Sequence, residues 1–165
     1  MTKIKLKGND INTIGELPKI GTTAQDFSMV KTDLSEVNLY SFKAKYKLLS
    51  IFPSLDTATC AMSVRTFNKK AASIHDTVVL NISKDLPFAQ KRFCGAEGID
   101  RVETFSVFRS DFAKKYNLEI ADGPLKGLCS RAIIILDANN KVIYTEQVPD
   151  IVNEPNYDAA IKHLV

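Results

Sequence analysis

The chain has 165 residues, of which 45% are hydrophobic and 25% carry a charge. This size and composition are typical of one folded domain with a substantial core, and they exclude a disordered protein. The formal net charge of +3 comes from scattered lysines and arginines, so it does not indicate a nucleic-acid partner. No apolar stretch is long enough to span a membrane, and residues 1–8 lack the apolar core of a signal peptide. We therefore expect a cytoplasmic protein that binds neither nucleic acid nor a membrane.

The first part of the chain predicts a β-hairpin followed by short strands. Residues 2–7 alternate between polar and apolar side chains, residues 8–10 have turn composition, and residues 11–14 can return as the second strand. The lysines on the exposed face of this hairpin are typical of a ribbon with protected edges. A loop is expected at residues 15–26, followed by two short strands at 27–30 and 37–39. Residues 41–45 are expected to be polar and weakly helical.

The centre of the chain predicts a βαβ unit. Residues 47–52 form a short apolar segment with strand character, and residues 58–72 have apolar side chains at helical spacing. Residues 77–82 are a continuous apolar run rich in β-branched side chains, as in a buried parallel strand. We expect the helix to form a right-handed crossover between the two parallel strands.

The remaining pattern predicts helices and strands that complete one sheet. Ser83 can cap a helix that begins near Asp85, and Gly95 and Gly98 are expected to end it. A strand is expected at residues 102–105, a helix at 110–116 and a loop at 121–127. Two strands at 131–136 and 141–144 then form a hairpin, and a last helix covers 156–164. The order of elements indicates an α/β protein with a thioredoxin-like fold and an added N-terminal β-hairpin. Its central mixed sheet is flanked by helices, and residues 1–165 form a single domain.

Cys60 is the first candidate for chemistry, because it lies in the first turn of the helix that follows Pro53. Unpaired N–H groups and partial positive charge at a helix start stabilise a thiolate. Thr57 stands three residues earlier, where its hydroxyl can accept from the thiol or cap the helix, and Pro53 can keep water out of the loop. The alternative is a small buried hydrophobic residue, because Cys60 shares an apolar helical stripe with Val64, Phe67 and Ala71. The three local features favour a reactive cysteine.

Cys94 is the second candidate, at the C-terminal end of its expected helix. The helix dipole disfavours a thiolate there, which suits a thiol that attacks an already oxidised partner. Gly95 and Gly98 make this helix end easy to fray, so Cys94 could move. Position alone supports equally well a cysteine without a role. The thioredoxin C-x-x-C motif is absent.

The other polar candidates carry weaker signals. We interpret Cys129 as a packing residue, and His75 and His163 as surface residues near helix ends. Arg131, at the start of an expected strand, is either an exposed edge charge or a neighbour of the loop 53–60. In the second case its fixed charge would stabilise a thiolate and orient a bound oxygen. The spacing of cysteines and histidines does not predict a metal site, and no glycine pattern indicates a phosphate cradle.

A family resemblance is carried by these same residues. Pro53, Thr57 and Cys60 match the Pro-x-x-x-Thr-x-x-Cys motif of the peroxiredoxins. More narrowly, the segments 52–57, 85–98 and 121–128 resemble the bacterial thiol peroxidases, which are atypical two-cysteine peroxiredoxins. The likeness covers nearly the whole chain, including the N-terminal hairpin. The chain departs from the family at Ala58-Thr59, where the family usually has Pro or Gly followed by Val.

The resemblance implies a thiol-dependent peroxidase that reduces hydrogen peroxide and alkyl hydroperoxides. In this interpretation Cys60 is the peroxidatic cysteine, Thr57 and Arg131 bind and polarise the peroxide, and Pro53 shields the site. Cys94 is the resolving cysteine of the same subunit. The resemblance further implies a homodimer that thioredoxin reduces, with no metal or organic cofactor.

Two other functions are compatible with the residues. In a redox-responsive binding protein, a Cys60–Cys94 switch would change a partner surface, and peroxide turnover would be incidental. A thioredoxin-fold disulfide reductase is disfavoured because the C-x-x-C motif is missing.

Overall fold

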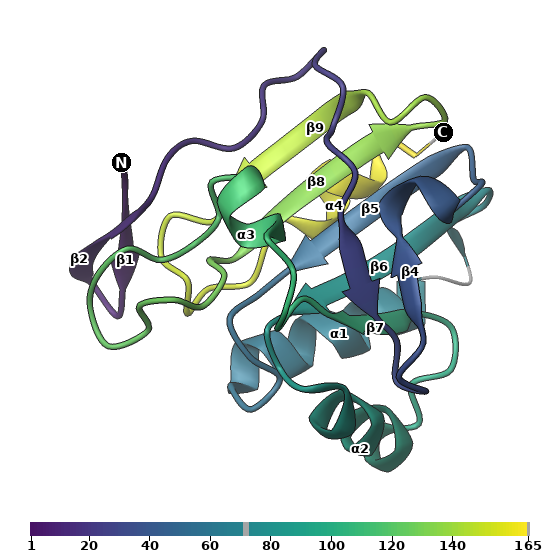
Figure 1. Cartoon of the computed structure of the whole chain (residues 1–165), viewed down its shortest axis with the longest axis horizontal. Coiled ribbons are helices and arrows are strands. Elements are labelled where there is room, and N and C mark those ends of the chain that lie inside the picture. The colour runs from purple at the N-terminus through teal and green to yellow at the C-terminus, as the bar shows by residue number, and fades with distance from the viewer. Residues whose placement is uncertain (71–72, 165) are drawn as a thin grey trace.

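The computed structural model describes residues 1–70 and 73–164. Its centre is a seven-stranded sheet with the strand order β4-β3-β7-β6-β5-β8-β9, and a separate pair, β1-β2, lies at one end of the molecule (Figure 1). The strands are β1 (Thr2–Leu6), β2 (Asn9–Thr13), β3 (Ser28–Val30), β4 (Glu36–Asn38), β5 (Tyr46–Ile51), β6 (Thr77–Ser83), β7 (Glu103–Ser106), β8 (Ala132–Asp137) and β9 (Val142–Gln147). The helices are η1 (Leu39–Ser41, a 3₁₀ turn), α1 (Ala58–Lys70), α2 (Pro87–Glu97), α3 (Phe112–Lys115) and α4 (Tyr157–Ile161).

The pairing of the strands confirms the predicted mixed sheet and βαβ unit. β6 runs parallel to both β5 and β7, whereas β8 runs antiparallel to β5 and to β9. The helix α1 connects the parallel strands β5 and β6. The N-terminal hairpin is also present, with Ile4 opposite Ile11 on its buried side. The fold is therefore the expected thioredoxin-like one with an added hairpin.

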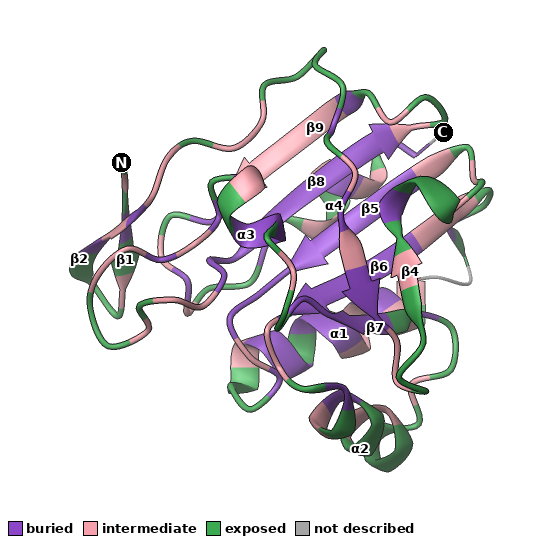
Figure 2. Ribbon diagram, in the orientation of Figure 1, coloured by how far each residue is buried: buried purple, intermediate pink, exposed green. Residues whose placement is uncertain are grey.

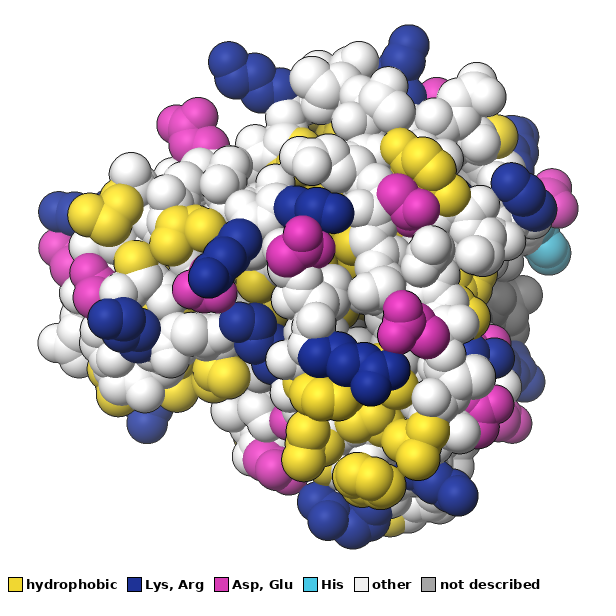
Figure 3. Space-filling view, viewed as in Figure 1, with side chains coloured by type: hydrophobic (Ala, Val, Ile, Leu, Met, Phe, Trp, Pro, Cys, Tyr) yellow, Lys and Arg dark blue, Asp and Glu magenta, His cyan; other side chains and the backbone are white. Residues whose placement is uncertain are grey.

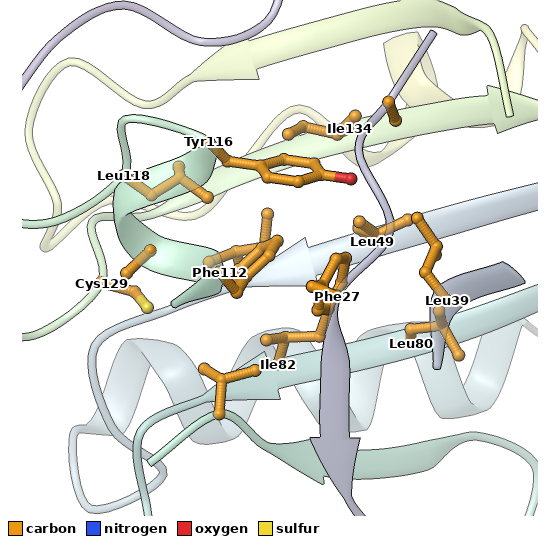
Figure 4. Packing of buried hydrophobic residues seen from close by; sticks show 14 of the residues in the cluster. Phe27, Leu39, Leu49, Leu80, Ile82, Phe112, Tyr116, Leu118, Cys129 and Ile134 are labelled. Atoms are coloured by element: carbon orange, nitrogen blue, oxygen red, sulfur yellow. The ribbon is translucent and has the colours of Figure 1, made fainter. Parts of the chain in front are cut away.

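The central strands are buried on both faces, because helices or loops cover each side of the sheet (Figure 2). Alternate side chains of β5 and β8 belong to two different cores. One core includes α3 and the rings of Phe27, Phe112 and Tyr116, with Cys129 at its edge (Figure 4). The other core packs α1 and α4 against the opposite face and contains Cys60.

Several local expectations are wrong. Helix α2 does not end at Gly95 but continues to Glu97, and Gly98 alone ends it in the left-handed conformation, with φ of 64°. Ser83 does not cap α2, because it lies in β6 and its hydroxyl donates to the Asp85 carboxylate over 2.6 Å. The last helix is shorter than expected and is capped by the side chain of Asn156.

Some expectations concern exposure or fall beyond what the structure describes. Ala71 and Ala72, at the expected end of the central helix, lie outside the described residues. His75 and His163 are exposed, as predicted. In the part of the chain that is described, no helix is both long and apolar enough to cross a membrane.

Candidate active site

The loop from Pro53 to Thr57 leads from β5 into α1 and places Cys60 in the first helical turn. Thr57 caps this helix: its backbone carbonyl accepts from the Ala61 N–H at 3.0 Å, and its hydroxyl accepts from the Cys60 N–H at 3.4 Å. The same hydroxyl donates to the Ser54 carbonyl at 3.1 Å. The predicted capping role of Thr57 is therefore confirmed. Pro53 is buried and Thr57 is exposed, so Thr57 lies at the mouth of the site.

Cys60 is fully buried, in the core formed by α1, α4 and one face of the sheet. This agrees with the apolar stripe seen in the sequence, but the sulfur also has a polar neighbour. Arg131 Nη2 donates to Cys60 Sγ over 3.0 Å. A guanidinium at this distance stabilises negative charge on the sulfur, and the burial of both residues reduces screening by solvent. Cys60 can therefore be both a buried core residue and a reactive thiol.

Arg131 is placed beside Cys60 by the register of the sheet. Ala132, the first residue of β8, pairs with Ile51, the last residue of β5, so Arg131 lies next to the loop that follows β5. Its side chain is only 2% exposed, so it is not an exposed edge charge. Arg131 Nε donates to the Ile151 carbonyl at 2.8 Å. The guanidinium is therefore held at one end and contacts the sulfur at the other.

One nitrogen of this guanidinium lacks a hydrogen-bond partner among the described residues. Arg131 Nη1 is buried and makes no hydrogen bond within the described residues. A buried donor without an acceptor typically costs about 1–3 kcal/mol. An oxygen atom bound beside Cys60 Sγ would supply the missing acceptor. The arrangement can therefore hold a small oxygen-containing molecule next to a nucleophilic sulfur.

Asp85 supports the loop and was not singled out by the sequence patterns. Its carboxylate accepts from the Ser54 hydroxyl at 2.7 Å and from the Leu55 N–H at 2.8 Å. It also accepts from the Ser83 hydroxyl at the end of β6. These bonds join the loop between β5 and α1 to the neighbouring strand. The sequence patterns placed Asp85 at the start of an expected helix and in the resembling segment 85–98, and neither signal pointed to the loop before α1.

A second unforeseen contribution comes from the segment after β9. The Ile151 carbonyl accepts from Arg131, and the Val152 carbonyl accepts from the Thr59 hydroxyl at 2.7 Å. Thr59 occupies one of the two positions at which the chain departs from the resembling family. Its hydroxyl makes a bond that a valine could not make.

Cys94 lies near the end of α2 and contacts neither Cys60 nor Arg131 in the described hydrogen bonds. Its Sγ is 3.5 Å from Thr104 Oγ1 in β7. Burial raises the pKa of the Cys94 thiol, and the contact with Thr104 opposes this only in part. All three cysteines are free. The structure thus brings together Pro53, Thr57, Cys60 and Arg131, and leaves Cys94 on a separate helix.

The end of α2 is fastened to α1. Glu97 accepts two hydrogen bonds from the Arg65 guanidinium, at 2.9 and 2.8 Å. The Arg65 guanidinium carbon also lies 5.9 Å from the centre of the Phe93 ring. Most of α2 is exposed, and only Pro87 and Gln90 are buried. The helix that carries Cys94 therefore lies mostly at the surface, and its last turn is tied to α1.

Cys129 is a packing residue, as predicted. It is fully buried beside α3 in the core of Figure 4. Burial raises its pKa to about 12, so this thiol remains protonated and unreactive at neutral pH.

Comparison with known proteins gives a consistent result. The family model described as Redoxin matches residues 19–161. Thiol peroxidases of Mycobacterium bovis and Mycobacterium tuberculosis are 52% identical over 164 residues, which is 99% of this chain and 99% of each relative. Among solved structures, a peroxiredoxin-like protein from Aquifex aeolicus has a TM-score of 0.94 and 37% identity, covering 99% of this chain and 96% of its own. A thiol peroxidase from Chromobacterium violaceum has a TM-score of 0.90 and 26% identity, and the match covers 99% of this chain and 95% of the other. The chain belongs to the Redoxin family, and within it to the thiol peroxidases, which are enzymes of the peroxiredoxin type.

Proposed function

We propose that this thiol peroxidase reduces hydrogen peroxide and organic hydroperoxides through a two-cysteine cycle. The observation that carries the proposal is the contact between Arg131 Nη2 and Cys60 Sγ at 3.0 Å, with a second, unpartnered donor on the same guanidinium. The Cys60 thiolate attacks the terminal oxygen of the hydroperoxide, and the O–O bond breaks. Cys60 becomes a sulfenic acid, and the other oxygen leaves and is protonated to water or an alcohol.

Arg131 stabilises the negative charge in this step, and Thr57 helps to position the peroxide. The Arg131 guanidinium stabilises the thiolate before attack, and its free Nη1 donates to the peroxide. The Thr57 hydroxyl lies at the mouth of the site and orients the bound oxygens. Pro53, the buried first residue of the loop, limits the access of water. The electrons that reduce the peroxide come from cysteine sulfur, so the cycle requires neither a metal nor an organic cofactor.

Cys94 then resolves the sulfenic acid within the same chain. Its sulfur bonds to Cys60 Sγ, and the sulfenic hydroxyl leaves with the thiol proton as water. A disulfide requires Cα atoms within about 7 Å of each other. Cys60 is fixed in the first turn of α1, whereas Cys94 is on a mostly exposed helix that contains Gly95. We therefore propose that the end of α2 unwinds to bring Cys94 to Cys60.

The disulfide must be reduced by a second molecule, and we propose thioredoxin. Cys129 is fully buried and remains a thiol at neutral pH, so it does not reduce the pair from within the chain. A thiol cycle of this kind also needs a reducing compartment to return it to the dithiol state. This supports the proposed cytoplasmic location.

The proposed preference for organic hydroperoxides rests on a groove beside Thr57. The groove has a volume of about 910 Å³ and runs between the N-terminal hairpin, the start of α1 and the loop that follows α3. Its apolar lining consists of Leu6, Ile11, Ala58, Pro124, Leu125 and Val152. The apolar part of an alkyl hydroperoxide can bury surface there while its peroxide group reaches the site.

The proposed homodimer rests on a patch of exposed apolar side chains. Leu86 and Phe88 at the start of α2 are 51% and 66% exposed, and Phe108 after β7 is 43% exposed. Figure 3 shows hydrophobic side chains gathered over α2, with basic side chains around them. We propose that a second copy of the chain covers this patch. Measuring the mass in solution of the native protein and of Phe88→Asp tests this, because the substitution should shift a dimer to monomer.

The cycle is tested by mass spectrometry of the reduced protein after one equivalent of cumene hydroperoxide. A loss of two hydrogens, with a Cys60–Cys94 peptide pair after digestion, supports the cycle. No reaction, or a disulfide that contains Cys129, contradicts it. Slow reaction without reduction by thioredoxin would instead favour a redox-responsive binding protein.

A further inference from the structure

The segment from Pro149 to Val152, called the strap here, bonds to two neighbours of Cys60, namely Arg131 and Thr59. Its Ile151 carbonyl holds Arg131 Nε at 2.8 Å, and its Val152 carbonyl holds the Thr59 hydroxyl at 2.7 Å. Within the described residues the Arg131 side chain has no other hydrogen-bond acceptor besides Cys60 Sγ, and its Nη1 makes no hydrogen bond there. The direction of the guanidinium therefore depends on the position of the strap.

The strap is held in turn by the N-terminal hairpin. The Lys5 N–H donates to the Pro149 carbonyl at 2.7 Å, and the Ile151 N–H donates to the Lys5 carbonyl at 3.0 Å. The strap thus pairs in parallel with β1, with Lys5 opposite Asp150. The hairpin lies at one end of the molecule (Figure 1) and lines one side of the groove beside Thr57.

Asp150 fastens the strap to the turn of the hairpin. Its carboxylate accepts from the Gly8 N–H at 2.8 Å, the Lys7 N–H at 3.1 Å and the strap's own Val152 N–H at 3.3 Å. Lys7 and Gly8 have φ values of 51° and 83°, the left-handed conformation of a tight hairpin turn. Burial opposes ionisation of Asp150, but the N–H donors outweigh it and hold its pKa below the usual value.

We infer that Asp150 is a positioning residue of the active site: by fastening the strap to the turn of the N-terminal hairpin, it orients Arg131 toward Cys60. This inference rests on the proposed roles of Cys60 and Arg131. A long arginine side chain has many rotamers, and only a fixed acceptor selects the one that reaches the sulfur. Small displacements of such a group have large effects on rate. Thr59 adds a second tie to the strap, from the helix that carries Cys60.

The test compares Asp150→Ala with a matched control, Asp122→Ala. Asp122 also ties the hairpin, because it accepts from Asn12 N and Asn12 Nδ2, both at 2.8 Å. It does so from the loop after α3 and not from the strap. We expect Asp150→Ala to slow the reaction of reduced protein with hydrogen peroxide roughly tenfold. We expect Asp122→Ala to leave this rate within about twofold of the native value.

A double-mutant cycle separates positioning from a general loss of structure. If Asp150 acts through Arg131, Asp150→Ala has no further effect on rate in the Arg131→Ala background. Equal slowing in both backgrounds overturns the inference, and so does equal slowing by Asp122→Ala. Asp150→Asn keeps the side-chain shape and one acceptor oxygen, so it repeats the cycle if the alanine variant does not fold. Its expected rate lies between those of the native protein and Asp150→Ala.

A second readout keeps the inference distinct from the proposed function. The ultraviolet absorbance of the Cys60 thiolate, with Cys60→Ser as the blank, is measured at neutral pH without peroxide. We expect Asp150→Ala to lower this absorbance part of the way toward that of Arg131→Ala. An unchanged signal overturns the inference, whereas a native protein that fails to consume peroxide contradicts only the proposed function.

Discussion

Replacing Arg131 with alanine is the sharpest test of the site. The substitution removes the donor 3.0 Å from Cys60 Sγ and the unpartnered Nη1. Loss of one donor aimed at developing charge costs about 2.7–4 kcal/mol, or roughly 100- to 1,000-fold in rate. We therefore expect the second-order rate of peroxide consumption by the reduced protein to fall by that factor. Arg131→Lys keeps the charge but loses the planar fork, so its loss should be intermediate.

Stability provides the control for this prediction. Arg131 is a buried charge with an unsatisfied donor, and removing such a group relieves part of the cost of burial. The melting temperature should thus change by only a few degrees while the rate collapses. Arg109→Ala is the matched control, because it removes an exposed arginine paired with Glu36 at 3.0 Å. The assay is single-turnover, stopped-flow consumption of hydrogen peroxide. A rate for Arg131→Ala within about threefold of the native rate would refute the reasoning.

The remaining predictions concern the other cysteines and Asp85. Cys94→Ser should consume one equivalent of peroxide and then stop, and thioredoxin-coupled turnover of this variant would contradict its resolving role. In the native protein, disulfide formation should accelerate about tenfold per pH unit near neutrality, because burial raises the pKa of Cys94 and only its thiolate attacks. A pH-independent rate would show that unwinding of α2 is limiting. Cys129→Ser should keep the native rate but lose about 1–3 kcal/mol of stability in denaturant, since it buries a hydroxyl among apolar residues. Asp85→Ala frees the Ser54 hydroxyl and the Leu55 N–H, so peroxide consumption should slow roughly tenfold, and an unchanged rate would exclude a role in shaping the loop.

Local patterns determined where Cys60, the proposed reactive cysteine, lies. A strand that ends before Pro53, a capping threonine and an apolar helical stripe are all short-range features, so they placed Cys60 in the first turn of α1 before any fold was known. The order of strands and helices followed from hydrophobic periodicity in the same way. Neither inference depends on which residues pack around these elements in the folded protein.

Only the tertiary structure decided what surrounds the sulfur. The sequence left Arg131 as either an edge charge or a neighbour of the loop, and the antiparallel pairing of β8 with β5 made it a neighbour. Helix α2 passes Gly95, where the sequence predicted an end, and Glu97 in its last turn bonds to Arg65 on another helix. Asp85 and the strap are far from their partners in the sequence, and the hydrogen bonds that join them to the site leave no periodic signal. Propensity and periodicity act between near neighbours in the chain, whereas the electrostatic environment of Cys60 is made by residues that only the folded sheet and hairpin bring together.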